Sequence, residues 1–207
     1  MDKRLLTSLL TVLIVVMSVY YIFFNGAMLF KLIPMALIIL YGVTLLPKRR
    51  ETYHYLTLIG LLFCITGDYT LQWFIVGLFS FLIGHIFYIF SFRRQKSTLA
   101  KKDSFRIIIS IYALIMMSIM TVFLVKDANY AFVVPVILYT SIIAYMAYTA
   151  WQTKQIWLIV GSLLFLISDS ILAWNKFVGS IEFSGVLIMV TYYSAQYCIA
   201  TSLKHYK

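Results

Sequence analysis

The sequence predicts an all-α, polytopic membrane protein with eight transmembrane helices, and three observations support this prediction. Hydrophobic residues make up 63% of the 207 residues and charged residues only 12%, whereas soluble domains are about half apolar and about a quarter charged. The apolar runs approach the roughly 20 residues that a helix needs to cross a bilayer. Basic residues lie in the short loops between these runs, as is typical of membrane proteins, so the formal charge of +10 does not indicate nucleic-acid binding.

Eight apolar runs follow one another along the chain. They span residues 5–24, 29–46, 53–71, 74–92, 105–125, 130–150, 155–174 and 182–203. The first run follows Lys3 and Arg4 as a signal peptide would, but it lacks a small-x-small cleavage site and is predicted to be a retained span. Residues that favour turns separate later runs, at 25–26, 47–50, 127–129 and 175–180. The weakest break is Gln72-Trp73, and its loss would merge the third and fourth helices.

The distribution of basic residues orients the predicted helices. With the N-terminus in the cytoplasm, fourteen of the 17 Lys and Arg residues fall on the cytoplasmic side, and only Lys31, Lys126 and Lys176 fall on the outer side. Cytoplasmic loops of membrane proteins are enriched in Lys and Arg. We therefore predict a multi-pass protein of the cell membrane with both termini in the cytoplasm.

One stretch of the chain occurs twice, with the pattern G-x₇-D-x₂-L-x-W. The first copy spans residues 60–73 and the second 161–174, so that Asp68 corresponds to Asp169 at an offset of 101 residues, and Pro34 corresponds to Pro135 at the same offset. We therefore predict one transmembrane domain, residues 1–207, with a parallel 4+4 internal repeat whose halves cover about 1–100 and 101–207. Some transporters have such repeats. The alternative is that apolar helices resemble one another by chance.

The two aspartates of this repeat are the first candidates for chemistry. Of seven acidic residues, only Asp68 and Asp169 fall inside predicted spans, each near the outer end of its helix. A carboxylate at that depth is costly and usually faces a partner or a cavity. Two neighbouring carboxyl groups can act as a general acid beside a general base. The alternative interpretation is a pair of protonated aspartates that join helices by hydrogen bonds.

Five other polar residues in the predicted helices have both a functional and a structural interpretation. Lys31 is either a cation for a phosphate headgroup or a carboxylate, or an interfacial lysine that extends to the membrane surface. His85 shares a helix face with Tyr88, and it either contacts substrate or packs in the core. Tyr192 and Gln196 lie inside the eighth helix, where the amide could orient a water or bridge two helices.

Several common catalytic patterns are missing from the sequence. It has no glycine-rich phosphate loop, no G-x-S-x-G motif and no Cys/His cluster, so we predict neither a metal site nor a cofactor. Cys64 and Cys198 lie in apolar runs and are interpreted as small packing residues.

Five short blocks in this order resemble the YhhN-like family of integral membrane lysoplasmalogenases. The blocks are K-x-x-P-M at 31–35, G-D-x-x-L at 67–71, G-H-x-x-Y at 84–88, S-D-x-x-L at 168–172 and Y-x-x-x-Q at 192–196. With the length and the number of spans, the resemblance covers nearly the whole chain.

The resemblance implies hydrolysis of the sn-1 vinyl ether of a lysoplasmalogen, which gives an aldehyde and a glycerophospho-headgroup. A lysophospholipid and the bilayer would then be the partners. Such a reaction needs a proton donor, a base for water and a negative charge beside the developing cation. We predict these acid and base roles for Asp68 and Asp169. Lys31, His85, Tyr88, Tyr192 and Gln196 would contact the substrate or water.

Two other functions fit the same residues. A parallel repeat with paired intramembrane acids also suits a small proton-coupled transporter. A lipid-binding membrane protein without catalysis is the third interpretation. An enzyme would release aldehyde in detergent, where a transporter has no gradient to use. The oligomeric state is not predicted, and the outward position of the acids predicts that lipid enters from the outer leaflet.

Overall fold

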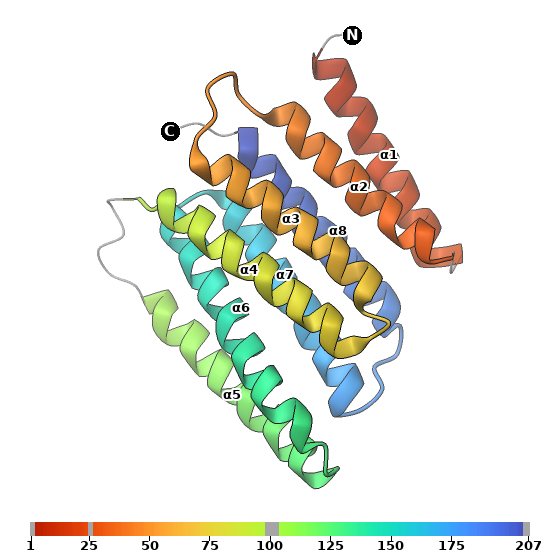
Figure 1. Ribbon diagram of the computed structural model, residues 1–207, viewed down its shortest axis with the longest axis vertical. Coiled ribbons are helices and arrows are strands. Elements are labelled where there is room, and N and C mark those ends of the chain that lie inside the picture. The colour runs from red at the N-terminus through yellow and green to blue at the C-terminus, as the bar shows by residue number, and fades with distance from the viewer. Residues whose placement is uncertain (1–2, 25–26, 98–103, 205–207) are drawn as a thin grey trace.

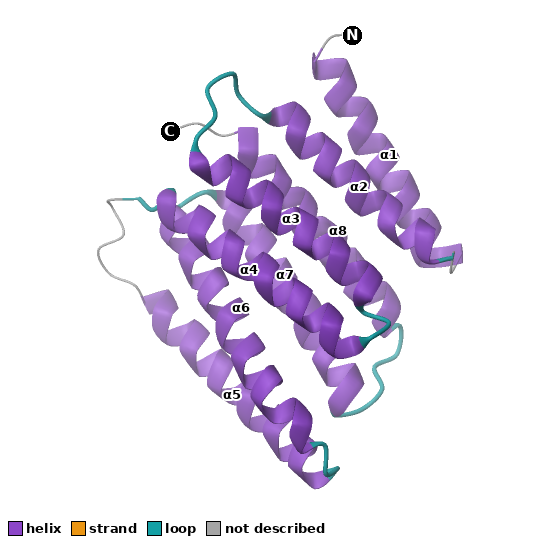
Figure 2. Ribbon diagram, in the orientation of Figure 1, coloured by secondary structure: helices purple, strands orange, loops and turns teal. Residues whose placement is uncertain are grey.

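The computed structural model describes residues 3–24, 27–97 and 104–204, and within these ranges the chain is helical (Figure 2). The described residues form eight α-helices and two short 3₁₀ turns. These are α1 (Lys3–Phe24), α2 (Met28–Leu45), α3 (Thr52–Thr70), α4 (Phe74–Arg94), α5 (Ser104–Lys126), η1 (Tyr130–Phe132), α6 (Val133–Thr153), α7 (Ile156–Phe177), α8 (Ser184–Thr201) and η2 (Ser202–Lys204). Every predicted helix is present, and the all-α fold is confirmed.

The predicted breaks that fall on described residues interrupt the helices, except that α7 continues through residues 175–177 of the break predicted at 175–180 and ends at Phe177. Between α3 and α4, the N–H of Leu71 donates to the carbonyl of Gly67 at 2.8 Å, and the N–H of Trp73 donates to Thr70 at 2.8 Å. After α5, Ala128 takes a left-handed conformation with φ 55°. The predicted turn at 25–26, the predicted boundary between halves at 100–101 and the cations Lys101, Lys102 and Lys207 lie outside the described residues.

Seven of the eight described helices are long and apolar enough to cross a membrane. The helix that does not meet this measure is α3, which carries His54, Thr57 and Asp68 as buried polar residues. These side chains face protein: the hydroxyl of Thr57, for example, lies 2.7 Å from that of Ser91 on α4. Neighbouring helices therefore shelter the polar face of α3.

Glycines bring α3 and α4 close together. A Cβ atom at Gly60 would lie 2.5 Å from the ring of Tyr88, and one at Gly84 would lie 3.1 Å from the carbonyl oxygen of Gly60. Only glycine fits such an approach without displacing its neighbour. The close contact fixes the buried Tyr88 ring against α3 and so positions one of the predicted site residues.

The same neighbours recur in the two halves of the chain (Figure 1). In the first half α1 packs on α2 and α3 on α4, while in the second half α5 packs on α6 and α7 on α8. Between the halves, α4 packs on α6 as α8 packs on α2. Helices α1 and α5 occupy opposite edges of the array in Figure 1. This arrangement is consistent with the 4+4 repeat, whose symmetry axis stays a prediction.

The edge helices present apolar side chains to the surroundings. Val12 on α1 is 61% exposed, and Ile107 and Leu114 on α5 are 64% and 60% exposed. Large contiguous apolar surfaces are rare on soluble monomers. With the apolar lengths of its helices, this surface makes the protein a multi-pass membrane protein.

Candidate functional site

Asp68 lies where α2, α3 and α8 meet. Its side chain is almost fully buried, with a relative exposure of 2% for the residue. The hydroxyl of Tyr192 on α8 donates a 2.6 Å hydrogen bond to Oδ2. The Lys31 Nζ atom on α2 lies 3.6 Å from Oδ1 and donates to the backbone carbonyl of Asp68 at 3.2 Å. A cation and a hydroxyl donor therefore balance this carboxylate inside the protein.

The Lys31 residue is itself held by α8. The hydroxyl of Tyr193 donates a 2.8 Å hydrogen bond to the backbone carbonyl of Lys31. Only 9% of Lys31 is exposed. The sequence suggested two functional partners for Lys31, a phosphate headgroup and a carboxylate. In the structure its partner is the Asp68 carboxylate, and such pairing is the usual way to accommodate an ionisable group at membrane depth.

Asp169 has a different environment, between α6 and α7. Its Oδ2 accepts a hydrogen bond from the hydroxyl of Tyr139 on α6. It is half-buried, and no ion pair involving it is found within the described ranges. The carboxylate lines a cavity between α4, α5, α6 and α7, beside apolar side chains such as Met116 and Met120 of α5.

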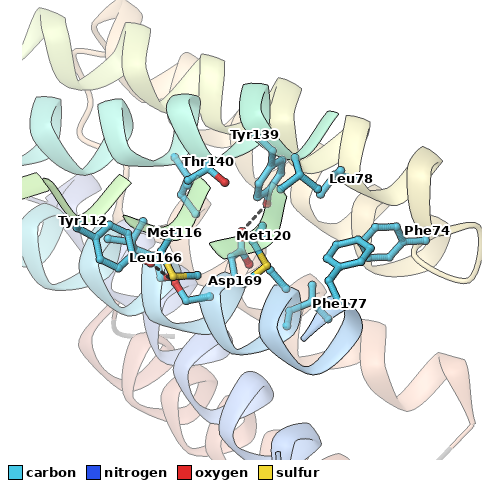
Figure 3. A pocket seen from close by; sticks show the side chains of 15 residues that line it. Phe74, Leu78, Tyr112, Met116, Met120, Tyr139, Thr140, Leu166, Asp169 and Phe177 are labelled. Carbon is cyan, nitrogen blue, oxygen red and sulfur yellow. Dashed lines mark hydrogen bonds between the residues drawn. The ribbon is translucent and has the colours of Figure 1, made fainter. Parts of the chain in front are cut away.

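The cavity has two distinct ends (Figure 3). Phe74 and Phe177 lie at one end and Tyr112 at the other, with Asp169 and Tyr139 between them. The hydroxyls of Tyr112 and Ser170 form a hydrogen bond with each other. Asp169 is therefore a carboxyl group that borders a small apolar cavity of about 40 Å³.

A row of buried rings separates the two acids. The ring of Phe165 on α7 lies 5.4 Å from that of Tyr192 and 4.6 Å from that of His85, and the His85 ring lies 5.4 Å from that of Tyr139. The Tyr192 end of this row contacts Asp68, and the Tyr139 end contacts Asp169. No hydrogen bond joins the two carboxylates in the described part of the chain, because each carboxylate accepts from its own tyrosine.

Polar atoms without a protein partner lie near this row. Both ring nitrogens of His85 and the amide nitrogen of Gln196 are buried and form no hydrogen bond among the described residues. The Gln196 oxygen accepts a 2.7 Å hydrogen bond from the Tyr88 hydroxyl. Buried polar groups are normally satisfied, and water or a polar ligand often fills the places where protein does not. His85 and Gln196 are therefore candidates for binding water or a substrate oxygen.

The structure thus groups the seven predicted residues in three places. Lys31 and Tyr192 contact Asp68, Tyr88 contacts Gln196, and His85 lies in the ring row that leads toward Asp169. Two residues of the site, Tyr139 and Phe165, were not predicted. Since the chain has 16 Tyr and 16 Phe residues, no local pattern distinguishes these two, although Tyr139 follows the repeated Pro135 by one helical turn.

Comparison with known proteins agrees with the resemblance seen in the sequence. The chain is 30% identical over 159 residues to "Lysoplasmalogenase TMEM86A" of Bos taurus and 31% identical over 160 residues to that of Homo sapiens; each alignment covers 70% of this chain and 63% of the relative. It is 28% identical over 180 residues to "Lysoplasmalogenase TMEM86B" of Mus musculus, covering 84% of this chain and 74% of the relative.

The chain therefore spans just under two thirds of the length of the TMEM86A relatives. No solved structure matches it. The pattern of the YhhN family matches residues 26–203, which is most of the 207-residue chain. This protein belongs to the YhhN family.

Proposed function

We propose that the protein is a membrane hydrolase that cleaves the sn-1 vinyl ether of lysoplasmalogens to an aldehyde and a glycerophospho-headgroup. The observation that carries this proposal is a carboxyl group, Asp169, that lines an apolar cavity, with a second buried carboxylate, Asp68, at the other end of the adjoining row of rings. Membership of the YhhN family and the names of the mammalian relatives support the choice of substrate.

The proposed reaction begins with transfer of a proton to the β-carbon of the vinyl ether. The π electrons form the new C–H bond and leave an oxocarbenium ion at the ether carbon. Water then adds to that carbon and loses a proton, giving a hemiacetal. Collapse of the hemiacetal breaks the bond to the glycerol oxygen, which takes up a proton, and releases the aldehyde. The protein must therefore donate a proton, accept one and stabilise a positive charge.

Access distinguishes the two acids. Asp169 lines the cavity, so it is the proposed proton donor, and after donation its carboxylate lies beside the cation and can accept the proton of water. Asp68 is enclosed and its charge is balanced by Lys31, so it is not proposed to meet the substrate, and its proposed role is to hold Tyr192 at the far end of the ring row. The unpartnered ring nitrogens of His85, whose ring lies 5.4 Å from that of the cavity residue Tyr139, are the proposed site for the attacking water.

The test is aldehyde release by the protein purified in detergent. Wild type is incubated with a lysoplasmalogen beside Asp169→Asn, which keeps the shape of the side chain and removes the transferable proton. We expect kcat to fall by about 10² to 10⁴, the usual contribution of general acid–base catalysis. Because Asp68→Asn would leave the Lys31 cation unpaired, it is assayed with Lys31→Met in the same chain. Absence of aldehyde from folded wild-type protein would contradict the proposal and favour a transporter.

The proposed orientation has both termini in the cytoplasm, because the described helices retain the charge asymmetry of the sequence. The cavity end with Phe74 and Phe177 then faces the outer leaflet, from which the lipid would enter. A cysteine at Gln72, in the α3–α4 turn, would be labelled by an impermeant thiol reagent added outside intact cells. If Gln72→Cys were labelled only after the cytoplasmic face is exposed to the reagent, the orientation would be opposite to the one proposed.

A further inference from the structure

The end of the cavity nearest Phe74 carries an aromatic cluster. The cluster consists of Phe74 at the start of α4, Phe132 in η1 and Phe177 at the end of α7. The ring centroids of Phe74 and Phe132 are 5.9 Å apart, those of Phe74 and Phe177 are 5.5 Å apart, and those of Phe132 and Phe177 are 5.6 Å apart. Two of these rings, those of Phe74 and Phe177, also line the cavity. The cluster is therefore the rim of the cavity that contains Asp169.

A single cation lies against this rim among the described residues. The Lys176 Nζ atom is 5.3 Å from the centroid of the Phe74 ring. Lys176 is exposed, and it forms no ion pair within the described ranges. A cation over an aromatic face at an exposed site is held weakly. An anion arriving at the rim would give Lys176 a charge-assisted partner that the protein does not provide.

The other two cations at this end of the bundle are placed differently. The Lys31 ammonium group is already beside Asp68. Lys126, at the end of α5, lines a separate groove with Met117 and Ile137. Only Lys176 combines a free ammonium group with contact to the rim of the Asp169 cavity in the described structure. This difference supplies a matched control within the same chain.

The spacing of Lys176 and Asp169 fits the chemistry of a lysophospholipid. The two residues are seven positions apart on α7, or about 10 Å along the helix axis. Side chains on a helix lean toward its N-terminus, so the long lysine side chain shortens the distance to the reacting group. In an sn-1 lysophospholipid, the glycerol backbone alone separates the ether oxygen from the phosphate oxygens.

We propose that Lys176 binds the phosphate group of a lysophospholipid whose sn-1 linkage lies beside Asp169. The identity of the reacting bond rests on the function proposed above, while the phosphate contact does not. In this arrangement the headgroup lies at the Phe74–Phe132–Phe177 rim and the hydrocarbon chain extends toward Met116 and Tyr112. The cavity has a volume of only about 40 Å³, so its lining must move apart to admit the chain, and flexible methionine side chains such as Met116 allow such a rearrangement. Lys176 thereby selects phosphate-bearing lipids over ether lipids without phosphate.

The first test compares two substrates that differ only in the phosphate headgroup. Lys176→Gln, Lys176→Arg and the control Lys126→Gln are assayed with a lysoplasmalogen and with a 1-alkenylglycerol at fixed detergent. We expect Lys176→Gln to raise KM for the lysoplasmalogen by about tenfold with little change in kcat, which is the loss of a binding contact rather than of catalysis. The alkenylglycerol should show no change. Lys176→Arg, which keeps the charge, should keep a KM close to that of wild type.

The second test measures binding without turnover. The probe is a radiolabelled lysophospholipid with a saturated sn-1 alkyl ether, which lacks the vinyl group that the proposed reaction protonates. We expect Kd to rise by about tenfold in Lys176→Gln and to stay unchanged in Lys126→Gln. Inorganic phosphate is measured as a competitor to separate a lipid site from a site for the free anion.

The outcomes separate this inference from the proposed function. Equal binding of the probe by wild type and Lys176→Gln would overturn the phosphate site even if aldehyde is released. Binding that depends on Lys176, with no aldehyde from a lysoplasmalogen, would retain the phosphate site and overturn the hydrolase. Inorganic phosphate that binds as tightly as the lysolipid would overturn the assignment to a lipid headgroup.

Discussion

The two copies of the repeated motif place the same residue in two different environments. Asp68 and Asp169 occupy equivalent positions in the two motifs, 101 residues apart, although α3 ends two residues after Asp68 and α7 continues for eight residues after Asp169. Asp68 is enclosed, with a hydroxyl and a cation as partners. Asp169 has a hydroxyl partner and an open cavity. The two halves therefore repeat the position of the acid but not its surroundings.

A single position in the preceding helices accounts for much of this difference. Lys31 precedes the repeated proline by three residues in the first half, and the equivalent position in the second half is Phe132 (31 + 101 = 132). Lys31 turns inward to Asp68, whereas Phe132 joins the aromatic rim of the Asp169 cavity. One copy of the repeat is thus closed by an ion pair, and the other is bordered by a cluster of aromatic rings.

The largest effect on stability is expected from breaking the ion pair of the first copy. Asp68→Asn leaves the buried Lys31 ammonium group without a countercharge, which typically costs about 3–5 kcal/mol. Asp169→Asn leaves no unpaired cation, so it should change the stability little. Thermal unfolding of both variants in one detergent measures the difference.

Restoring the balance of charge sharpens this test. The double variant Lys31→Met, Asp68→Asn removes both charges and should recover most of the stability lost in Asp68→Asn. Similar unfolding temperatures for the two single Asn variants would show that the two environments are equivalent, contrary to the structure.

A smaller effect is expected at the glycine that opens each copy. A Cβ atom at Gly60 would lie 2.5 Å and 2.6 Å from two atoms of the buried Tyr88 ring, while one at Gly161 would lie 2.9 Å from Cγ1 of Ile199 and 3.0 Å from the backbone oxygen of Ala195. Overpacking of this kind costs about 1–3 kcal/mol. Because the overlap with the Tyr88 ring at Gly60 is deeper than any overlap at Gly161, we expect Gly60→Ala to lower the unfolding temperature more than Gly161→Ala. The reverse order would mean that Tyr88 is not fixed between α3 and α4.

The sequence predicts the helices better than it predicts the contacts between them. Apolar length and turn residues are local signals, and so every helix is found close to its expected place, including the break at Gln72-Trp73. The two acids were also recognisable, because a carboxyl group inside an apolar run is conspicuous. Their hydroxyl partners were harder to predict. Tyr192 lies in a recognisable motif and was predicted, whereas Tyr139 is one of 16 tyrosines and was not.

The reason for this limit is that helix order around a bundle is not a local property. Tyr139 reaches Asp169 because α6 packs on α7, and Phe165 separates the acids because α7 packs on α8. The composition of a helix does not reveal which other helix packs against it, so neither contact could be predicted from the sequence. The cavity rim likewise joins residues from α4, η1 and α7, which no spacing in the sequence connects.

The smallest effect that tests the comparison concerns the two tyrosine donors. Tyr139→Phe removes the hydroxyl that donates to Asp169, and Tyr192→Phe removes the one that donates to Asp68. Each loss should cost about 1 kcal/mol of stability, as for a typical hydrogen bond. Their effects on turnover should differ, because Asp68 keeps Lys31 beside it whereas Asp169 loses its donor. We therefore expect a several-fold fall in kcat for Tyr139→Phe and a smaller one for Tyr192→Phe, measured as aldehyde release at saturating substrate. Equal falls would indicate that the acids act as one coupled pair across the Phe165–His85 row, and that the two copies differ in enclosure but not in function.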